Sequence, residues 1–135
     1  MTKEELVKAA VGAMAKAYAP YSGFQVGAAL LCEDGTVYTG CNIENAGFSA
    51  TVCAERTAFF KAVSDGKMHF SAIAICGGKN GILSGDILPP CGICRQVMRE
   101  FCSDDFLIHM PYDQGIKTHT LAELLPLSFA PESIR

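Results

Sequence analysis

The chain has 135 residues, enough to bury one hydrophobic core but too few for two independent domains. Half of its residues are hydrophobic, yet it contains no run of about 18 apolar residues, so we expect neither a membrane-spanning helix nor a membrane partner. The net charge is -3 and the lysines and arginines are scattered, which disfavours a nucleic-acid partner and favours a small-molecule substrate.

The first half of the chain predicts a helix, a β-hairpin and a second helix. A Thr-x-x-Glu capping box opens the first helix, whose apolar residues share one face over residues 2–19. Alternating apolar residues predict strands over 24–30 and 37–43, joined by a Glu-Asp-Gly turn. Residues 44–51 are rich in Asn, Gly and Ser and predict a loop, and the apolar pattern of residues 52–65 predicts a helix that a glycine ends.

In the second half, strands and helices alternate. A buried strand precedes a long loop, a helix entered through two prolines, a short hairpin and a last helix with its own capping box. The expected elements are a strand over 70–76, a loop over 77–90, a helix over 91–101, strands over 106–110 and 116–119, and a helix from 120 that Pro126 ends. This order predicts a single α/β domain over residues 1–135, with a mixed sheet that has a parallel core and helices on its faces.

The seven cysteines are an odd number, and residues 1–5 lack the apolar start of a secretory signal. We therefore expect the cytoplasm, and metal binding, catalysis or simple burial rather than a disulfide framework. Four cysteines lie in apolar or alternating stretches, where a cysteine is usually a small buried hydrophobe. We assign no chemistry to these four: Cys32, Cys41, Cys76 and Cys102.

Cys91 and Cys94 stand three residues apart at the start of a predicted helix, close enough to bind one metal ion. The same spacing serves redox chemistry in thioredoxin-like proteins, so the pair alone does not separate the two kinds of site. Cys53 favours the metal, because it begins another predicted helix, and the positive ends of two helix dipoles would lower the pKa of all three thiols. Three thiolates with one open position are typical of catalytic zinc, whereas structural zinc takes four protein ligands.

A fourth ligand from His69, His109 or His119 would close the site into a structural zinc centre. Each histidine lies in or beside a predicted strand, where structural histidines are common. None of them has ligand spacing to the cysteines. The sequence therefore favours the open, catalytic site.

Glu55 lies two residues after Cys53, and a regular helix would turn the two side chains about 200° apart. Side chains in a first turn lean toward the N-terminus, however, where Glu55 can reach a water on the metal that Cys53 binds. A lone glutamate here would more often serve only the helix dipole, but beside three thiols it indicates proton transfer. Arg56 and Arg95 are candidates to donate to the sulfurs and offset their charge, and a solvated surface position is the alternative for each.

Two motifs, Cys53-Ala54-Glu55-Arg56 and Pro90-Cys91-Gly92-Ile93-Cys94-Arg95-Gln96, resemble the zinc signature of the cytidine deaminase family. The resemblance covers nearly the whole chain, which makes it far more specific than a C-x-x-C pair. Its further matches are Pro20-Tyr21-Ser22-Gly23-Phe24, Val26-Gly27-Ala28-Ala29-Leu30, Gly40-Cys41-Asn42-Ile43-Glu44-Asn45-Ala46, and Leu124-Leu125-Pro126 with Phe129.

The resemblance implies a three-layer αβα sandwich with a five-stranded mixed sheet and a homotetramer whose active sites lie at subunit interfaces. It implies one Zn²⁺ per subunit, held by Cys53, Cys91 and Cys94. The implied reaction is hydrolytic deamination of cytidine and 2′-deoxycytidine in pyrimidine nucleoside salvage, with Glu55 acting first as base and then as acid. The high apolar content of so small a chain also favours an oligomer.

Nucleoside contacts follow from the same resemblance. Asn42 and Glu44 would bond the ribose 3′-hydroxyl, whereas residue type alone also allows them to cap the loop. Phe24 would pack on the pyrimidine and Phe129 would cover it from a neighbouring subunit, whereas residue type alone allows core packing for both. The full implied set is Phe24, Asn42, Glu44, Ala54 and Phe129 for the substrate, with Arg56 beside the metal ligands. Phe48 stands where the family often has a tyrosine, which puts any hydroxyl contact there in question.

Three other functions stay open. The same zinc site could deaminate another aminated nucleoside, such as a nucleoside antibiotic, although Asn42 and Glu44 argue against this. Cys91 and Cys94 could serve a redox protein, although the third thiol favours a metal. A zinc-stabilised interaction module is the last alternative, and metal content together with a cytidine assay separates all of them.

Overall fold

The computed structural model describes residues 1–135, which form one five-stranded sheet and four α-helices. In chain order the elements are α1 (Lys3–Met14), β1 (Phe24–Cys32), β2 (Val37–Cys41), α2 (Ala54–Ser64), β3 (Phe70–Lys79), α3 (Gly92–Phe101), β4 (Leu107–Tyr112), β5 (Gly115–Thr120) and α4 (Leu121–Leu124). The strand order is β2-β1-β3-β4-β5. Short 3-10 helices span Phe48–Ala50 and Pro131–Ile134.

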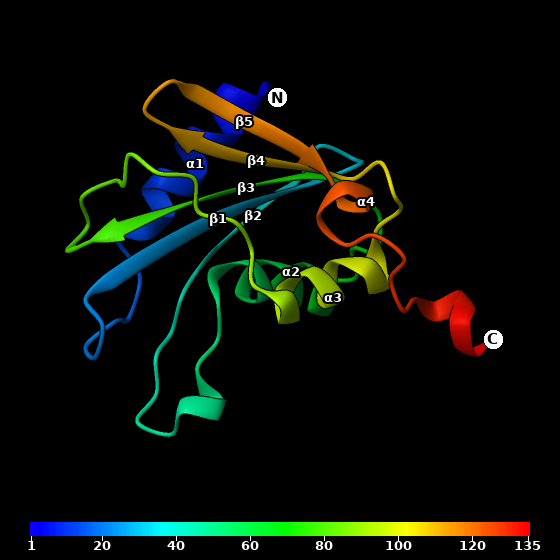
Figure 1. Ribbon diagram of the computed structural model, residues 1–135, viewed down its shortest axis with the longest axis horizontal. Coiled ribbons are helices and arrows are strands. Elements are labelled where there is room, and N and C mark those ends of the chain that lie inside the picture. The colour runs from blue at the N-terminus through cyan, green and yellow to red at the C-terminus, as the bar shows by residue number, and fades with distance from the viewer.

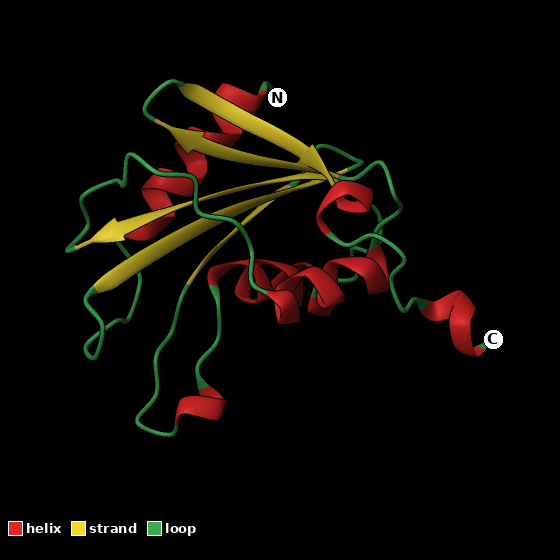
Figure 2. Cartoon of the chain, viewed as in Figure 1, coloured by secondary structure: helices red, strands yellow, loops and turns green.

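Helices cover both faces of this sheet, so the molecule has three layers (Figures 1 and 2). α1 packs against β1 and β3 on one face, whereas α2 packs against β2 and β1 on the other, with α3 beside it. The predicted αβα sandwich with a five-stranded mixed sheet is therefore confirmed. None of the helices has the length and apolar character that a membrane crossing requires.

The predicted parallel core was wrong, because only β3 and β4 run parallel. β1 pairs antiparallel with both β2 and β3, and β4 pairs antiparallel with β5. The two tight hairpins force antiparallel pairs, since only a long crossover can return a strand in the same direction. The segment that carries α3 joins β3 to β4, and it is the only connection between two neighbouring strands that lets them run in the same direction.

Side chains of the central strands alternate between two cores. On the α1 side the sheet contributes small residues, Ala29, Ala72 and Ala74, against Leu6 and Ala10 of the helix. On the other side the residues are larger and pack under α2, α3 and α4. This larger core includes Leu30, Ile73, Ile75, Phe59, Met98, Phe106 and Leu121.

Gly40 on β2 fixes how closely α2 approaches the sheet. A Cβ added at Gly40 would lie 2.3 Å from the carbonyl oxygen of Ala54 and 2.6 Å from the backbone nitrogen of Ala58. No side chain fits between strand and helix at that point. The beginning of α2, where Cys53 and Glu55 lie, is therefore held directly against the sheet.

Element boundaries differ from the predicted ones where tertiary pairing overrides the local pattern. The first helix ends at Met14, because Tyr18 pairs with Ile43 and its N–H donates to the carbonyl oxygen of Asn42 over 3.0 Å. β3 continues past Cys76 to Lys79, since its last residues still pair with the start of β1. Both predicted capping boxes are formed: Thr2 with Glu5, and Thr120 with Glu123.

Candidate active site and metal centre

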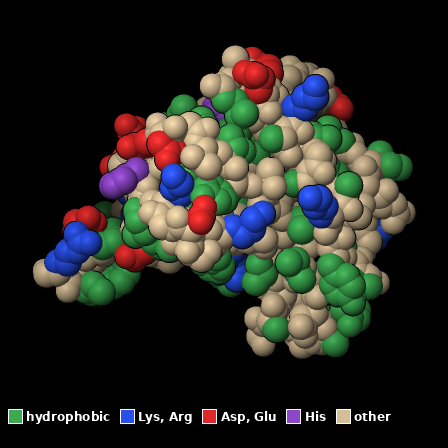
Figure 3. All heavy atoms as spheres, turned by 180° about the vertical axis from the view of Figure 1, so that it is seen from behind, with side chains coloured by type: hydrophobic (Ala, Val, Ile, Leu, Met, Phe, Trp, Pro, Cys, Tyr) green, Lys and Arg blue, Asp and Glu red, His purple; other side chains and the backbone are tan.

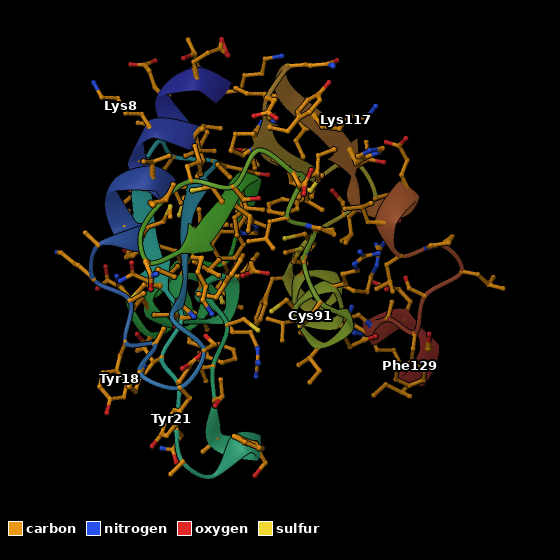
Figure 4. All side chains as sticks on the ribbon, turned by 60° about the vertical axis from the view of Figure 1, so that its left-hand side comes forward. Lys8, Tyr18, Tyr21, Cys91, Lys117 and Phe129 are labelled. Atoms are coloured by element: carbon orange, nitrogen blue, oxygen red, sulfur yellow. The ribbon has the colours of Figure 1, made fainter.

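Three cysteines meet at the N-termini of two helices. Cys53 is the N-cap of α2, Cys91 is the N-cap of α3, and Cys94 lies in the first turn of α3. The backbone N–H of Cys94 donates to Cys91 Sγ over 3.5 Å, so the two thiols of the C-x-x-C pair share one side of the turn. Figure 4 shows Cys91 at the start of α3, and its side chain is exposed, whereas that of Cys94 is buried. All seven cysteines are free thiols.

The sulfur positions fit a single zinc ion. The three Sγ atoms lie within 4.8 Å of one another, and Cys53 Sγ and Cys91 Sγ are 3.7 Å apart. Tetrahedral zinc with Zn–S bonds of about 2.3 Å would separate its sulfurs by about 3.8 Å. None of the three histidines belongs to this cluster, and the ring of His109 instead bonds to Thr118 Oγ1 at 2.8 Å. The site therefore offers three protein ligands and an open position, as predicted for zinc.

The pKa values of Cys53 and Cys94 are shifted in opposite directions. Hydrogen bonds from Cys94 and Arg56 hold the pKa of Cys53 well below its usual range, against the opposing effect of burial. The neighbouring Cys53 thiolate and burial raise the pKa of Cys94 instead. Binding of a divalent cation is coupled to the release of such protons.

The two arginines of the motifs have different partners. Arg56 Nη2 donates to Cys53 Sγ over 3.4 Å, so its positive charge lies against the sulfur cluster. Arg95 does not reach the sulfurs. Its Nε donates to the carbonyl oxygen of Pro90 over 2.8 Å and its Nη1 to that of Leu124 over 2.6 Å. Arg95 thus ties the start of α3 to the end of α4, and its proposed contact with the cysteines was wrong.

Glu55 lies beside the sulfurs at the bottom of a cavity. Its side chain is only 4% exposed, and this burial raises the pKa of the carboxyl group to about 7. Cys53 has the extended conformation of an N-cap, with φ -73° and ψ 156°, so the helical angle of 200° does not separate it from Glu55. A carboxyl group that titrates near neutral pH can both accept and donate a proton there.

The cavity beside Glu55 has a volume of about 240 Å³ and a mostly apolar wall. It brings together Phe24, Asn42, Ala54, Cys53 and Cys91, all of which the sequence had singled out. An apolar cleft with a few convergent polar groups is typical of a small-molecule site. Sequence reasoning missed the remaining lining residues: Val26, Thr51, Val52, Ile75, Leu88 and Pro89.

Asn42 joins this cavity to the start of β1. Its side chain is 8% exposed; Oδ1 accepts from the backbone N–H of Val26 and Nδ2 donates to the carbonyl oxygen of Phe24, both over 2.8 Å. These two bonds fix the strand at Phe24, whose side chain lines the cavity. Asn42 therefore has a structural role whatever it contacts in a ligand.

Glu44 lies outside the cavity that contains Glu55 and lines a neighbouring one of about 410 Å³. Thr51 lines both cavities, so they adjoin. Glu44 Oε1 accepts from the backbone N–H groups of Tyr21 and Ser22, over 2.9 and 3.1 Å, and Oε2 accepts from Ser22 Oγ over 2.5 Å. These bonds, that of the Ser22 side chain above all, lower the pKa of Glu44.

Phe129 does not belong to the cavity of its own chain. It is 62% exposed and is held only through its carbonyl oxygen, which accepts from Gln96 Nε2 over 2.8 Å. Figure 4 shows Phe129 on the C-terminal segment, away from Cys91. In a single copy of the chain most of Phe129 is therefore exposed.

Comparison with known proteins agrees with the geometry. The family model described as the cytidine and deoxycytidylate deaminase zinc-binding region matches residues 1–110. The chain is similar to a cytidine deaminase of Sporosarcina psychrophila, with 50% identity over 99% of this chain and 96% of that protein. A cytidine deaminase of Halalkalibacterium halodurans is 47% identical over 99% of this chain and 98% of its own length.

Solved structures show the same likeness. The crystal structure of a cytidine deaminase from Burkholderia pseudomallei superposes with a TM-score of 0.87 at 42% identity, covering 96% of this chain and all of that one. The cytidine deaminase of Mycobacterium tuberculosis superposes with a TM-score of 0.82 at 38% identity, covering 96% and 98% of the two chains.

Proposed function

Because the chain belongs to the cytidine and deoxycytidylate deaminase family, we infer that it is a zinc-dependent cytidine deaminase that converts cytidine to uridine and ammonia. The observation that carries this function is the position of Glu55, buried in the cavity beside the three thiols that fit zinc. We extend the activity to 2′-deoxycytidine, since the assigned ribose contact is to the 3′-hydroxyl, which both nucleosides carry.

Glu55 is the residue that moves protons. Zinc held by Cys53, Cys91 and Cys94 would act as a Lewis acid and make water a nucleophile near neutral pH. Glu55 accepts the proton of the attacking water and delivers it to N3 of the pyrimidine, while the water oxygen adds to C4. It then takes the remaining proton from the new C4 hydroxyl group and delivers it to the departing amine, so that the C4–O bond becomes a carbonyl while the C4–N bond breaks and ammonia leaves. One carboxyl group with a pKa of about 7 suits both transfers.

The remaining cavity residues hold the substrate. Phe24 and Ala54 supply apolar contact for the pyrimidine from the wall of the cavity. Asn42 and Glu44 are assigned to the ribose 3′-hydroxyl, and both retain capacity for it. Nδ2 of Asn42 has a second N–H, and the carboxylate of Glu44 has about four acceptor sites, of which three are used.

The active form is proposed to be a homotetramer in which Phe129 closes the cavity of a neighbouring subunit. Two parts of the chain project from the body: residues 42–53, which contain the 3-10 helix Phe48–Ala50 near their far end, and the segment after Pro126 (Figure 1). Figure 3 shows hydrophobic side chains gathered where these parts project. Phe48 is 83% exposed, Ile93 62% and Phe60 48%. Burial against other copies is the usual reason for so many exposed apolar side chains.

A role in pyrimidine nucleoside salvage in the cytoplasm follows from this activity and from the free thiols. Cytidine and deoxycytidine are small soluble nucleosides, and their products are pyrimidine nucleosides again. Seven free cysteines, three of which fit zinc as thiolates, suit a reducing compartment. Deamination of another aminated nucleoside by the same site is the second candidate, because the zinc and Glu55 would serve any such ring.

The test is an absorbance assay for cytidine loss on protein whose zinc has been measured. We expect about one zinc per chain and conversion of cytidine to uridine with release of ammonia. A zinc-loaded chain that leaves cytidine and deoxycytidine intact but deaminates another nucleoside would favour the second candidate. Zinc without any deamination would favour a zinc-stabilised interaction module, and redox turnover without zinc would favour a C-x-x-C redox protein.

A further inference from the structure

The turn between α1 and β1, residues 20–23, is centred on the hydroxyl group of Ser22. Ser22 Oγ donates to Glu44 Oε2 over 2.5 Å and accepts from the backbone N–H of Phe24 over 3.0 Å. Its two partners lie in different cavities, since Phe24 lines the one with Glu55 and Glu44 lines the adjoining one. One hydroxyl group thus connects the two ends of the site.

The backbone of this turn has other supports. Glu44 Oε1 accepts from two of its N–H groups, and Lys79 Nζ donates to the carbonyl oxygen of Ser22 over 2.5 Å. The N–H of Asn80 donates to the carbonyl oxygen of Gly23 over 2.7 Å. Gly23 itself has φ +69°, the left-handed region that glycine adopts without strain. Removal of the Ser22 hydroxyl alone therefore leaves the path of the turn supported.

We propose that Ser22 is a positioning residue, whose hydroxyl group holds the Glu44 carboxylate at a fixed place relative to Phe24. The inference rests on the proposed function, which assigns Phe24 to the base and Glu44 to the ribose. A nucleoside has a fixed distance between these two groups, so both contacts form together only when the two residues keep their spacing. Without the hydroxyl, Oε2 of Glu44 loses its one protein partner and the carboxylate can rotate about the bonds to Oε1.

The hydroxyl acts through Glu44 rather than on the substrate. It has one proton, which it donates to Glu44, so it has no proton left to donate to the substrate. Ser22 is therefore not a catalytic residue. Its loss is expected to weaken substrate binding while the chemistry at Glu55 continues.

The kinetic test compares Ser22→Ala with Ser22→Thr, which keeps the hydroxyl group, and with Ser71→Ala as matched control. Ser71 lines neither cavity, and its Oγ donates to the carbonyl oxygen of Leu31 on the sheet. We expect Ser22→Ala to raise KM for cytidine about tenfold, or about 1.4 kcal/mol, with kcat within twofold of the parent. Ser22→Thr should stay within threefold, and Ser71→Ala should match the parent in KM.

A double-mutant cycle tests the route through Glu44. In a Glu44→Gln background, Ser22→Ala should raise KM by less than threefold, because the bond it removes no longer holds a carboxylate. An undiminished tenfold effect would show that Ser22 acts on the substrate directly and would overturn the proposal. A KM within twofold of the parent in Ser22→Ala alone, or no rescue by threonine, would also overturn it.

Two measurements need no turnover. In the parent, ¹³C NMR should show the Glu44 carboxyl titrating below its usual value of 4.5, and in Ser22→Ala its pKa should rise toward that value. Amide exchange at Phe24 should become at least tenfold faster in the same variant. If the parent does not deaminate cytidine, the proposed function fails, while these two signals still decide whether Ser22 links Glu44 to Phe24. Unchanged titration and exchange would refute the link.

Discussion

The sulfur atoms of Cys53 and Cys91 lie 3.7 Å apart although 38 positions separate these residues in the sequence. Each is the N-cap of a helix, so the packing of α2 and α3 on one face of the sheet sets the distance between the sulfurs. That distance agrees with an edge of a zinc–sulfur tetrahedron, about 3.8 Å. The metal site therefore depends on the packing of two helices and not on one local motif.

Loss of either thiol of the C-x-x-C pair should remove the metal. Cys91→Ala or Cys94→Ala leaves two thiolates, which hold zinc poorly against a chelator. We expect zinc content to fall below about a tenth of the parent value after dialysis against EDTA, together with the cytidine deaminase activity. Cys41→Ala is the matched control, because Cys41 lies outside the cluster and its Sγ donates only to the carbonyl oxygen of Lys16. Metal-free protein with full activity would contradict this prediction.

Phe129→Ala should impair binding of cytidine and leave the zinc content unchanged. Phe129 is 62% exposed in one chain and does not line the cavity of its own chain, so its effect requires a second copy. Ile134→Ala, at a 76% exposed position of the same segment, is the control and should bind normally. Mixing Phe129→Ala with Glu55→Gln should restore part of the activity, since mixed oligomers form sites with both residues intact. Proven mixed oligomers without recovery would rule out action across subunits.

Gly40→Ala should destabilise the fold and loosen the metal site. The added Cβ would lie 2.3 Å from the carbonyl oxygen of Ala54, so α2 must move away from the sheet and carry Cys53 with it. We expect a loss of at least about 2 kcal/mol in the free energy of unfolding and weaker zinc retention. Gly12→Ala is the matched control, because a Cβ at Gly12 meets nothing within 4 Å on an exposed face of α1. That change should stabilise the protein by about 0.5–1 kcal/mol.

His109 should make the protein less stable in mild acid. It is 6% exposed, and burial, with the nearby charge of Lys3, lowers its pKa, against a smaller opposing effect of Glu4. The unfolded chain therefore binds more protons than the folded chain as the pH falls through about 6.5, and the free energy of unfolding decreases there. In His109→Gln this part of the decrease should disappear between pH 7 and 5, whereas exposed His69→Gln should keep it. Equal slopes in urea titrations of all three proteins would contradict the assignment.

Local patterns were sufficient to predict most elements of the fold but not how the strands pair. The capping boxes at Thr2 and Thr120 mark helix starts correctly, because each is satisfied within four residues. The end of the first helix was misplaced, since Tyr18 leaves the helix to pair with Ile43, a contact that no local pattern contains. The parallel core was misjudged for the same reason. Whether two neighbouring strands run parallel or antiparallel depends on which strands pair in the sheet, and no local pattern contains that information.

The candidate site was predicted to a similar extent. The spacing of Cys91 and Cys94 and the helix start at Cys53 indicated the metal cluster, since ligand type and position are visible in sequence. Leu88 had no such signal, because an apolar loop residue looks the same in a cavity wall and in a core. Ser22 had none either, since its role depends on Glu44, 22 positions away, which only the fold brings near.

Glu55→Gln should keep the fold, the zinc and nucleoside binding while losing nearly all turnover. The amide has the shape of the carboxyl group but cannot accept and return a proton. If Glu55 only stabilised α2 through its interaction with the helix dipole, the substitution would lower the free energy of unfolding by at most about 1 kcal/mol and leave the rate of deamination nearly intact. As general base and acid it should instead contribute at least about 10² to 10⁴-fold, or roughly 3 to 5 kcal/mol of barrier, and more because it acts twice.

The measurement is kcat for cytidine on zinc-analysed protein, with binding of cytidine followed separately by calorimetry. Glu100→Gln, an exposed glutamate on α3, is the control and should match the parent. A Glu55→Gln protein that carries zinc and turns over within tenfold of the parent would defeat the assignment of the proton carrier. An inactive variant that still binds cytidine would instead exclude a merely structural role, because fold, metal and substrate would all be in place and only the proton transfer would be missing.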